Sequence, residues 1–228
     1  MKRMFLIACG LLTGLLAFTS CQDDDCPGNH AVFPNAIVTV KAREDRTILQ
    51  LDDNTVLYPV NIPKPLYGGK EKRAFVNYRN ATGRERDTKS SATPYVFVNW
   101  LDTIRTKAMA PSKGTDNDAV YGNDPLEIVD SWETVVEDGY LTIRFRTFFS
   151  GGRIHKLNLV PGEKAYEVVL HHDAAGDLGG RLGDGVIAFR LDKLLIPHEE
   201  EGKVVNLTLR WNSFGGERTA RFQYRPRE

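Results

Sequence analysis

Apolar and polar side chains alternate along the first part of the chain in short runs typical of β-strands. In the first run, Ala36, Val38 and Val40 lie at alternate positions. Further runs, with turn residues between them, cover residues 49–51, 55–60, 73–78 and 95–106. About five strands in roughly 80 residues, without a convincing helix, predict a small closed barrel of the OB type. We assign this barrel to residues 32–110.

A second series of strands follows a stretch rich in Pro, Ser, Gly, Asn and Asp. This composition indicates a linker, which we assign to residues 111–123. Asp138-Gly139 is a dipeptide typical of a two-residue hairpin turn. About seven strands at this spacing predict an antiparallel β-sandwich. The chain is therefore expected to be all-β, with the sandwich at residues 124–228.

The N-terminus has the parts of a secretory signal peptide. Lys2 and Arg3 precede an apolar run, and small residues precede Cys21. A cysteine at this place is diacylated in bacterial lipoproteins, and the chain is cut before it. We therefore predict a signal peptide at residues 1–20, lipid attachment at Cys21 and an anchor in the outer membrane.

The residues after Cys21 form an acidic tether, assigned to residues 21–31. Gln22 is followed by three aspartates, and such a triplet resembles the surface-export signal of lipoproteins from anaerobic Gram-negative bacteria. A solvated linker is the alternative interpretation. The first interpretation predicts that the protein faces outward from the cell, whereas the second leaves its orientation open.

Charge and cysteine content exclude several classes of protein. Loss of Lys2 and Arg3 with the signal peptide reduces the 30 basic residues to 28 against 30 acidic residues, a net charge of −2. This balance argues against a nucleic-acid binder, which gains affinity by neutralising phosphates. Cys9 leaves with the signal peptide and Cys21 carries lipid, so Cys26 has no partner for an intramolecular disulfide. No cofactor or metal is expected.

His171-His172-Asp173 is the triplet that most resembles catalytic residues. Neighbouring strand residues point to opposite faces, so the two histidines are not expected to share a metal ion. The glycine-rich stretch at residues 176–185 lacks the alternate-residue ligands of a calcium loop. A nucleophile elbow of the Gly-x-Ser-x-Gly kind is also absent from the sequence. We therefore do not expect an enzyme.

Aromatic residues beside a locally basic stretch are the candidate ligand-binding residues. Seven lysines and arginines lie between Lys70 and Lys89, against three acidic residues. On an OB barrel, aromatic side chains flanked by cations can stack on bases or sugars. The alternative is that the aromatic residues fill the barrel core while the charges solvate a loop. The candidates are Tyr78, Tyr95, Phe97 and Trp100.

Strand and turn signatures recur along the chain, at residues 32–41, 51–55, 60–61, 124–132, 137–141 and 172–173. Taken together, these segments resemble the NigD-like lipoprotein family. The resemblance extends from about residue 32 to the end of the chain. It implies an N-terminal OB domain and a C-terminal β-sandwich. It also suggests a role in bacteriocin immunity, because the family is named after a member that is encoded with a bacteriocin. It supplies no catalytic or binding residues.

Three hypotheses for function follow in order of preference. The first is a non-catalytic lipoprotein of the cell envelope that binds a protein partner in an immunity-like role. The second is a surface module that binds glycans or mediates adhesion. The third, a hydrolase, would depend on His172 or Asp173.

Overall fold

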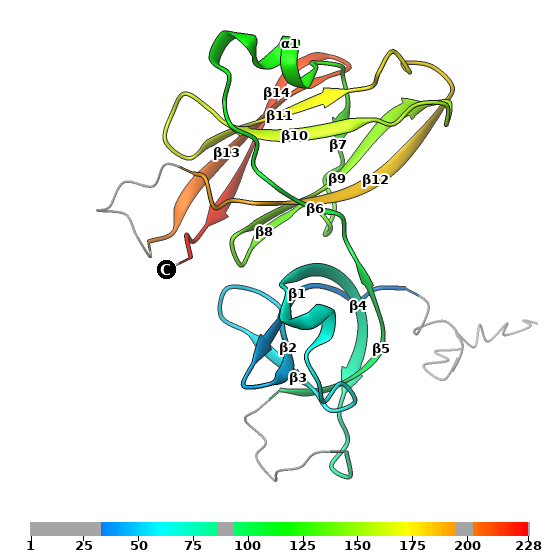
Figure 1. Ribbon diagram of the computed structural model, residues 1–228, viewed down its shortest axis with the longest axis vertical. Helices are drawn as coiled ribbons and strands as arrows, with labels where there is room; N and C mark the ends of the chain where they lie inside the picture. The colour runs from blue at the N-terminus through cyan, green and yellow to red at the C-terminus, as the bar shows by residue number, and fades with distance from the viewer. Residues whose placement is uncertain (1–32, 86–93, 195–202, 228) are drawn as a thin grey trace, which may run out of the picture.

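The N-terminal part of the chain closes into a five-stranded barrel (Figure 1). The strands pair in the order β1-β2-β3-β5-β4, and a short 3-10 helix, η1, follows β3. This arrangement confirms the predicted OB-like barrel. The elements are β1 (Ala36–Arg43), β2 (Arg46–Gln50), β3 (Val56–Pro59), η1 (Leu66–Gly69), β4 (Lys72–Asn80) and β5 (Tyr95–Thr103).

The structure is a computed structural model that describes residues 33–85, 94–194 and 203–227. The predicted signal peptide, the lipid-attachment residue Cys21 and the acidic tether lie outside the described residues. Both domains fall within the described ranges, apart from segments at residues 86–93 and 195–202.

Alternate side chains of the barrel strands fill its interior. Val38 and Val40 of β1 face Ala74 and Val76 of β4, and all four are at most 1% exposed. Because successive strand residues point to opposite faces, one apolar set fills the barrel while the other set faces outward. The outward positions are therefore available for contacts with the second domain and with solvent.

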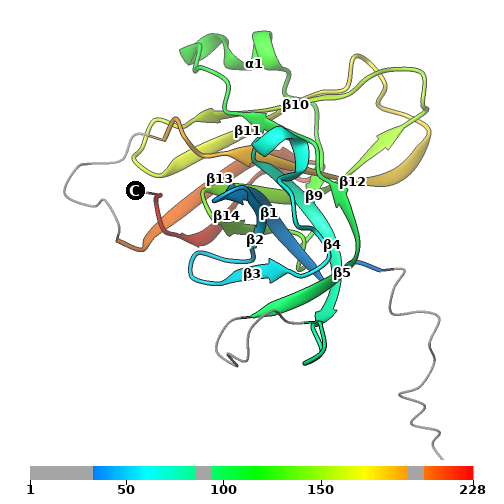
Figure 2. The ribbon, with the colours of Figure 1, turned by 60° about the horizontal axis from the view of Figure 1, so that its bottom comes forward.

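The second domain is a sandwich of a four-stranded and a five-stranded sheet. The first sheet has the order β10-β11-β13-β14, and the second has β6-β12-β9-β7 with β8 paired to β9. Figure 1 shows the barrel beneath this sandwich, and Figure 2 shows the molecule with the barrel turned toward the viewer. The strands are β6 (Thr106–Ala108), β7 (Glu127–Ile128), β8 (Val135–Glu137), β9 (Tyr140–Phe149), β10 (Lys156–Pro161), β11 (Glu167–Asp173), β12 (Arg181–Arg190), β13 (Val205–Ser213) and β14 (Gly216–Tyr224).

The observed sandwich differs in detail from the expected seven antiparallel strands. Three short strands, β6, β7 and β8, add to the second sheet, and β6 lies within the range assigned to the barrel. The pairs β6–β12 and β11–β13 are parallel. Alternation of apolar residues predicts which face of a strand is buried but not the direction of its neighbour, so these pairs were not foreseen.

A short helix, α1 (Asn117–Tyr121), occupies the segment expected to be a linker. It is preceded by the 3-10 turn η2 (Gly114–Asp116), and both lie over β10 and β11 (Figure 1). The segment therefore covers the outer face of the first sheet rather than only joining the domains.

The sandwich core lies between the two sheets. Leu141 and Ile143 of β9 face the same core as Leu207 and Leu209 of β13, and all four are fully buried. Burial of a side chain of this size contributes about 1.5–3 kcal/mol relative to exposure. This layer of branched side chains packs the two separately paired sheets together.

An apolar contact joins the barrel to the outer face of β12. Ile37 of β1 and Ile104, just after β5, pack with Ala188 of β12, and all three are at most 5% exposed. Phe75 and Val186 cover the edges of this cluster. The barrel thus covers part of the face that the second sheet turns away from its own core.

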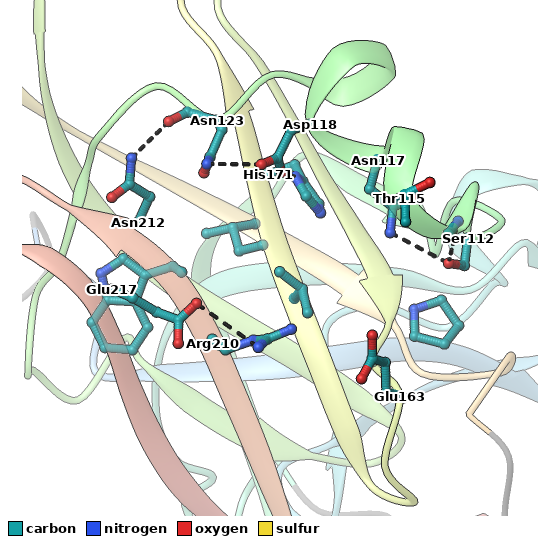
Figure 3. A pocket seen from close by; sticks show the side chains of 16 residues that line it. Ser112, Thr115, Asn117, Asp118, Asn123, Glu163, His171, Arg210, Asn212 and Glu217 are labelled. Carbon is teal, nitrogen blue, oxygen red and sulfur yellow. Dashed lines mark hydrogen bonds and ion pairs between the residues drawn. The ribbon is translucent and has the colours of Figure 1, made fainter.

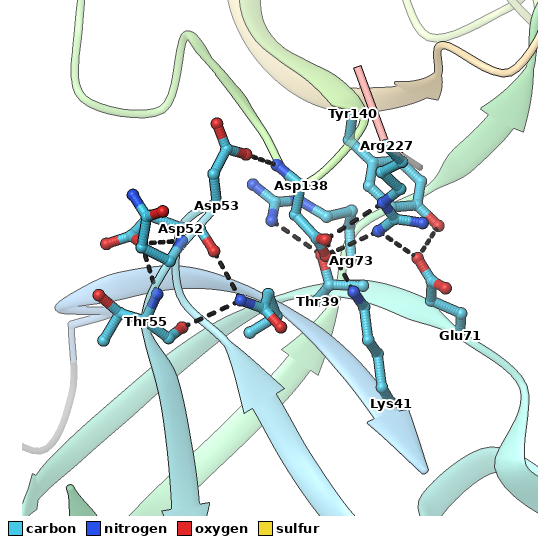
Figure 4. Close-up of polar contacts among 12 residues, drawn as sticks. Thr39, Lys41, Asp52, Asp53, Thr55, Glu71, Arg73, Asp138, Tyr140 and Arg227 are labelled. Atoms are coloured by element: carbon cyan, nitrogen blue, oxygen red, sulfur yellow. Dashed lines mark hydrogen bonds and ion pairs between the residues drawn. The ribbon is translucent and has the colours of Figure 1, made fainter. Parts of the chain in front are cut away.

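The hairpin turn at Asp138-Gly139 supplies polar contacts at the junction between the barrel and the sandwich (Figure 4). Asp138 and Gly139 have φ angles of 51° and 73°, as a two-residue hairpin turn of type I′ requires. The Asp138 N–H donates to the Asp53 carboxylate at 2.7 Å, and the Asp138 carboxylate lies 2.7 Å from Lys41 Nζ. Arg227, near the C-terminus, also pairs with Asp138 at 2.7 Å. The turn therefore bonds to the barrel through both its backbone and its side chain.

Arg73 is the most deeply buried charge at the junction, with a fully covered side chain. Its guanidinium donates to Thr39 Oγ1 at 3.1 Å within the barrel and to Glu137 at 3.3 Å in the sandwich. Burial lowers the pKa of Arg73, and the charge of Glu137 opposes this change. A buried cation is tolerated only with such partners, so Arg73 links the two domains.

We expect Arg73→Met to reduce the free energy of unfolding by about 2–4 kcal/mol, because it leaves Glu137 without its cation in a partly buried place. The double variant Arg73→Met/Glu137→Met should recover part of this loss. Arg79→Met is the control, since the Arg79–Glu85 pair lies at the surface, where solvent screens the attraction and little stability is lost. Urea unfolding measures all three, and equal losses for Arg73→Met and Arg79→Met would contradict the assigned role.

Candidate functional site

A groove of about 660 Å³ crosses the barrel at β2, β3 and the turn between β1 and β2. Tyr58 and Tyr95 lie side by side in it, with ring centroids 6.0 Å apart, because β3 and β5 pair in parallel at these two residues. Exposed Arg43 and Arg46 line the groove with Glu44. This face of an OB-fold is the one that commonly binds oligomers.

The four aromatic residues singled out in the sequence occupy different environments. Tyr78 packs against the barrel core, and burial raises its pKa. Tyr95 lines the groove, whereas Phe97 lies under the Arg79 guanidinium, 4.4 Å from its ring centroid. Trp100 is half-buried on β5. The structure therefore brings only Tyr95 of these four to the groove.

Tyr58 is the groove residue that the sequence interpretation missed. It lies in a predicted strand, but its closeness to Tyr95 depends on the parallel pairing of β3 and β5. The basic stretch is also less available than its composition suggests. Arg79 is bound by Glu85 through two contacts of 2.8 Å, which lower the pKa of Glu85 to about 2.

The two neighbouring histidines of β11 point to opposite faces of the sheet, as predicted for strand residues. His171 faces outward toward α1, where its Nδ1 lies 3.0 Å from the carbonyl oxygen of Gly122. His172 faces the inside, where its Nε2 lies 3.0 Å from Nδ1 of His155. Asp173 accepts a hydrogen bond from the backbone N–H of Ala175 at 2.8 Å. The triplet therefore does not form one site.

His172 belongs to a buried chain of polar groups. Its Nδ1 lies 3.3 Å from the carbonyl oxygen of Asp124, so that nitrogen carries the proton and Nε2 accepts from His155. The other nitrogen of His155 faces Asp177 at 3.6 Å. The sequence interpretation missed His155 and its approach to Asp177, because the two residues lie in different loops.

The loop carboxylate Asp177 is itself held in place. It accepts the backbone N–H of Ser150 at 3.0 Å, and this hydrogen bond lowers its pKa. The contact joins the loop after β9 to the loop after β11. Half of the glycine-rich stretch expected to be a loop is strand, since β12 begins at Arg181.

The outer face of the second sheet carries charges held by one carboxylate. Asp184 of β12 binds Arg144 and Arg146 of β9 at 2.6 Å each. The Arg146 and Arg144 guanidinium groups lower the pKa of Asp184 to about 2. The arginines are therefore fixed in position rather than extended into solvent.

Next to these charges, Phe148, Leu182 and Phe214 form what we call the aromatic patch. Phe148 and Leu182 are directly opposed on β9 and β12, so their side chains share a face. The rings of Phe148 and Phe214 lie 5.4 Å apart, edge to face. The three side chains are 38–47% exposed. They form an apolar surface beside fixed arginines.

A polar pocket of about 310 Å³ lies on the opposite side of the sandwich, between the α1 segment and the outer face of β11 and β13. Figure 3 shows His171, Asp118 and Arg210 among the side chains around it. The pocket is lined largely by amide, carboxylate and hydroxyl groups.

Within residues 33–85, 94–194 and 203–227, no three His, Cys, Asp or Glu side chains come together in a way that could hold a metal ion. In the same ranges, no helix has the length and apolar character needed to cross a bilayer.

Comparison with known proteins gives consistent matches for both domains. Residues 37–104 match the NigD-like N-terminal OB domain, and residues 108–224 match the NigD-like C-terminal beta sandwich domain. No curated protein matches the chain.

Solved structures resemble the whole two-domain arrangement. A protein described as toxin-related from Parabacteroides distasonis ATCC 8503 has 29% identity and a TM-score of 0.65, over 83% of this chain and 92% of that one. A protein of unknown function from Bacteroides vulgatus ATCC 8482 has 25% identity and a TM-score of 0.63, over 84% and 90%. A NigD-like immunity protein from Bacteroides caccae ATCC 43185 shares the fold at 20% identity and a TM-score of 0.58, over 84% and 96%.

The His155–His172 contact predicts a pH dependence of stability. Burial, and then the charge of His155, lower the pKa of His172 below its ordinary value of 6.5. The unfolded chain therefore binds this proton first as the pH falls, so the stabilisation is complete above about pH 6.5 and is lost below it. We expect a lower Tm at pH 5 than at pH 7.5, and a smaller difference in His172→Gln, by circular dichroism. An unchanged difference in this variant would contradict the assignment.

Proposed function

Because the chain belongs to the NigD-like family, we propose that it is a non-catalytic lipoprotein of the cell envelope that binds a protein partner. The observation that carries this proposal is the aromatic patch beside Arg144 and Arg146. Aromatic residues and arginine are the side chains most enriched at the centres of protein interfaces. Exposed apolar surface of this kind commonly marks a contact with another macromolecule.

The positioned arginines support the proposal. Asp184 already holds both guanidinium groups, so little side-chain freedom is lost when a partner binds them. The contact of Phe148 with Phe214 fixes the apolar part in the same way. A surface that is ordered before binding suits a protein partner of complementary shape.

The partner we propose is a protein toxin made by a related strain, and the role is immunity-like. Support comes from the toxin-related protein similar to this chain at 29% identity. The N-terminal pattern supports export and attachment of lipid at Cys21, which would hold the chain at the outer membrane. At that membrane it would meet a toxin as the toxin enters the cell envelope.

A co-culture experiment tests this function. A clean deletion of the gene is grown against toxin-producing relatives and complemented with the parent, with Phe148→Ser/Phe214→Ser, or with Cys21→Ala. We expect the parent alone to restore survival, because the double variant loses the aromatic patch and Cys21→Ala loses the anchor. Colony counts and immunoblots of each variant measure survival and protein level.

The matched control is Ile154→Ser, which removes a side chain that is 78% exposed but outside the aromatic patch. It should protect as well as the parent. Equal survival of the deletion and parent strains would overturn the immunity-like role. Protection by the double variant at equal protein level would show that the aromatic patch is not needed for this role.

The groove with Tyr58 and Tyr95 favours glycan binding as a second candidate function. Two neighbouring rings flanked by arginines can stack on successive sugar units. We expect a glycan array to detect binding to the chain with Cys21→Ser, and Tyr95→Ala to weaken it at least about tenfold. Phe97→Ala is the control, since Phe97 lies on the same strand but does not line the groove. Equal loss in both variants, or no binding across the array, would count against this function.

A further inference from the structure

We propose that the polar pocket beneath α1 binds a protonated amine or guanidinium group. The pocket lies on the face of β11 and β13 that points away from the aromatic patch, so the inference does not depend on the proposed function. Its lining includes the carboxylates of Asp118, Glu163 and Glu217 against a single arginine, Arg210. Three carboxylates and one guanidinium carry a net charge of −2, which favours a cation over an anion.

His171 is the observation that points to a ligand. Its side chain is 4% exposed and lines the pocket. Nδ1 donates to the carbonyl oxygen of Gly122 at 3.0 Å, which leaves Nε2 as an acceptor in the neutral ring. Nε2 is buried and has no hydrogen-bond partner among the described residues. Because a buried acceptor without a donor is costly, this atom calls for an N–H or O–H group supplied by a ligand.

The carboxylate closest to His171 is oriented by its neighbours. Asp118 lies 3.4 Å from His171 Nδ1 and accepts a hydrogen bond from the Asn123 amide at 3.0 Å. Asn123 is tied in turn to β13, because the Asn212 amide donates to its carbonyl oxygen at 2.7 Å. Figure 3 shows this chain of contacts at the upper edge of the pocket. The Asp118 side chain is 62% exposed, so it remains accessible to an incoming cation.

The wall formed by residues 112–122 is also built in advance. Asn117 accepts the backbone N–H of Lys113 at 2.7 Å and donates to Ser112 Oγ at 3.3 Å, which closes the turn before α1. Gly122 adopts a φ of 83° and lies against β11, where a Cβ would come within 2.5 Å of the His172 carbonyl oxygen. This close approach brings the Gly122 carbonyl to His171. The pocket therefore exists before a ligand arrives.

The available groups favour donors on the ligand. Arg210 lies 3.8 Å from Glu217, so one carboxylate is already paired, while Asp118 and Glu163 remain as acceptors together with His171 Nε2. An ammonium or guanidinium group offers several N–H donors and a positive charge, whereas phosphate or carboxylate offers neither. The same group can come from a small amine or from a lysine or arginine side chain of a protein.

Isothermal titration calorimetry at low ionic strength and pH 7.5 tests the proposal, with the mature chain carrying Cys21→Ser. The probes are agmatine, N-acetyl-arginine methylamide and its neutral analogue N-acetyl-citrulline methylamide. We expect at least one cation to bind with a Kd below about 1 mM, and the citrulline analogue to bind at least tenfold more weakly. Tighter binding of agmatine would indicate a small amine as the natural ligand. Tighter binding of the arginine derivative would indicate a protein side chain.

Two conservative variants locate the site. Asp118→Asn and Glu163→Gln each keep the shape of an accessible side chain but remove its charge, so each should weaken binding of the cation at least about threefold. Asp130→Asn, at an exposed carboxylate outside the pocket, should leave binding unchanged. His171→Phe should abolish binding, and a normal thermal unfolding curve is the test that this variant folds.

Three outcomes would overturn the proposal. The first is absence of binding by both cations to the folded chain. The second is equal binding of the arginine and citrulline derivatives, which would show that charge is not recognised. The third is saturable binding of D-glucose that responds to Asp118→Asn and Glu163→Gln while the cations do not bind, which would identify a polyol site instead.

Discussion

The two-domain structure depends on one hairpin turn that docks on the barrel. Asp138 uses its backbone N–H for Asp53 and its carboxylate for Lys41, while Arg73 reaches from the barrel to Glu137, one residue before the turn. These contacts lie beside the small apolar cluster of Ile37, Ile104 and Ala188. Because charged groups this well covered need their partners, the polar contacts favour one relative position of the domains more than an apolar contact alone would. The surfaces of the barrel and of the sandwich therefore keep a fixed position relative to each other.

Strand β11 illustrates how the sandwich separates chemistry between its faces. His171 and His172 are neighbours in sequence, yet one lies beneath α1 and the other contacts His155 in the interior. The inner ring is fixed by an interior hydrogen-bond chain, so it stabilises the fold. The outer ring lines the polar pocket and keeps one buried nitrogen without a hydrogen-bond partner among the described residues. The two histidines have different surroundings because successive side chains of a strand point in opposite directions.

The surfaces proposed for binding are built on these outward positions. The barrel groove uses the outward aromatic residues Tyr58 and Tyr95, and the aromatic patch uses outward positions of β9 and β12. The polar pocket uses the outward face of β11 and β13. They lie on different faces and differ in chemistry, from aromatic to charged. A chain of this kind can contact more than one ligand without the surfaces competing for space.

The sequence by itself determined the all-β class, the order of barrel and sandwich, and the turn at Asp138-Gly139, because alternation and turn chemistry are local properties. It also indicated that His171 and His172 face apart. Only the tertiary structure decided that Tyr58 lies beside Tyr95 and that the supposed linker forms the wall of a pocket over His171. Parallel pairing, and the packing of a loop on a distant strand, depend on contacts between residues far apart in the chain. Local periodicity therefore does not predict those contacts.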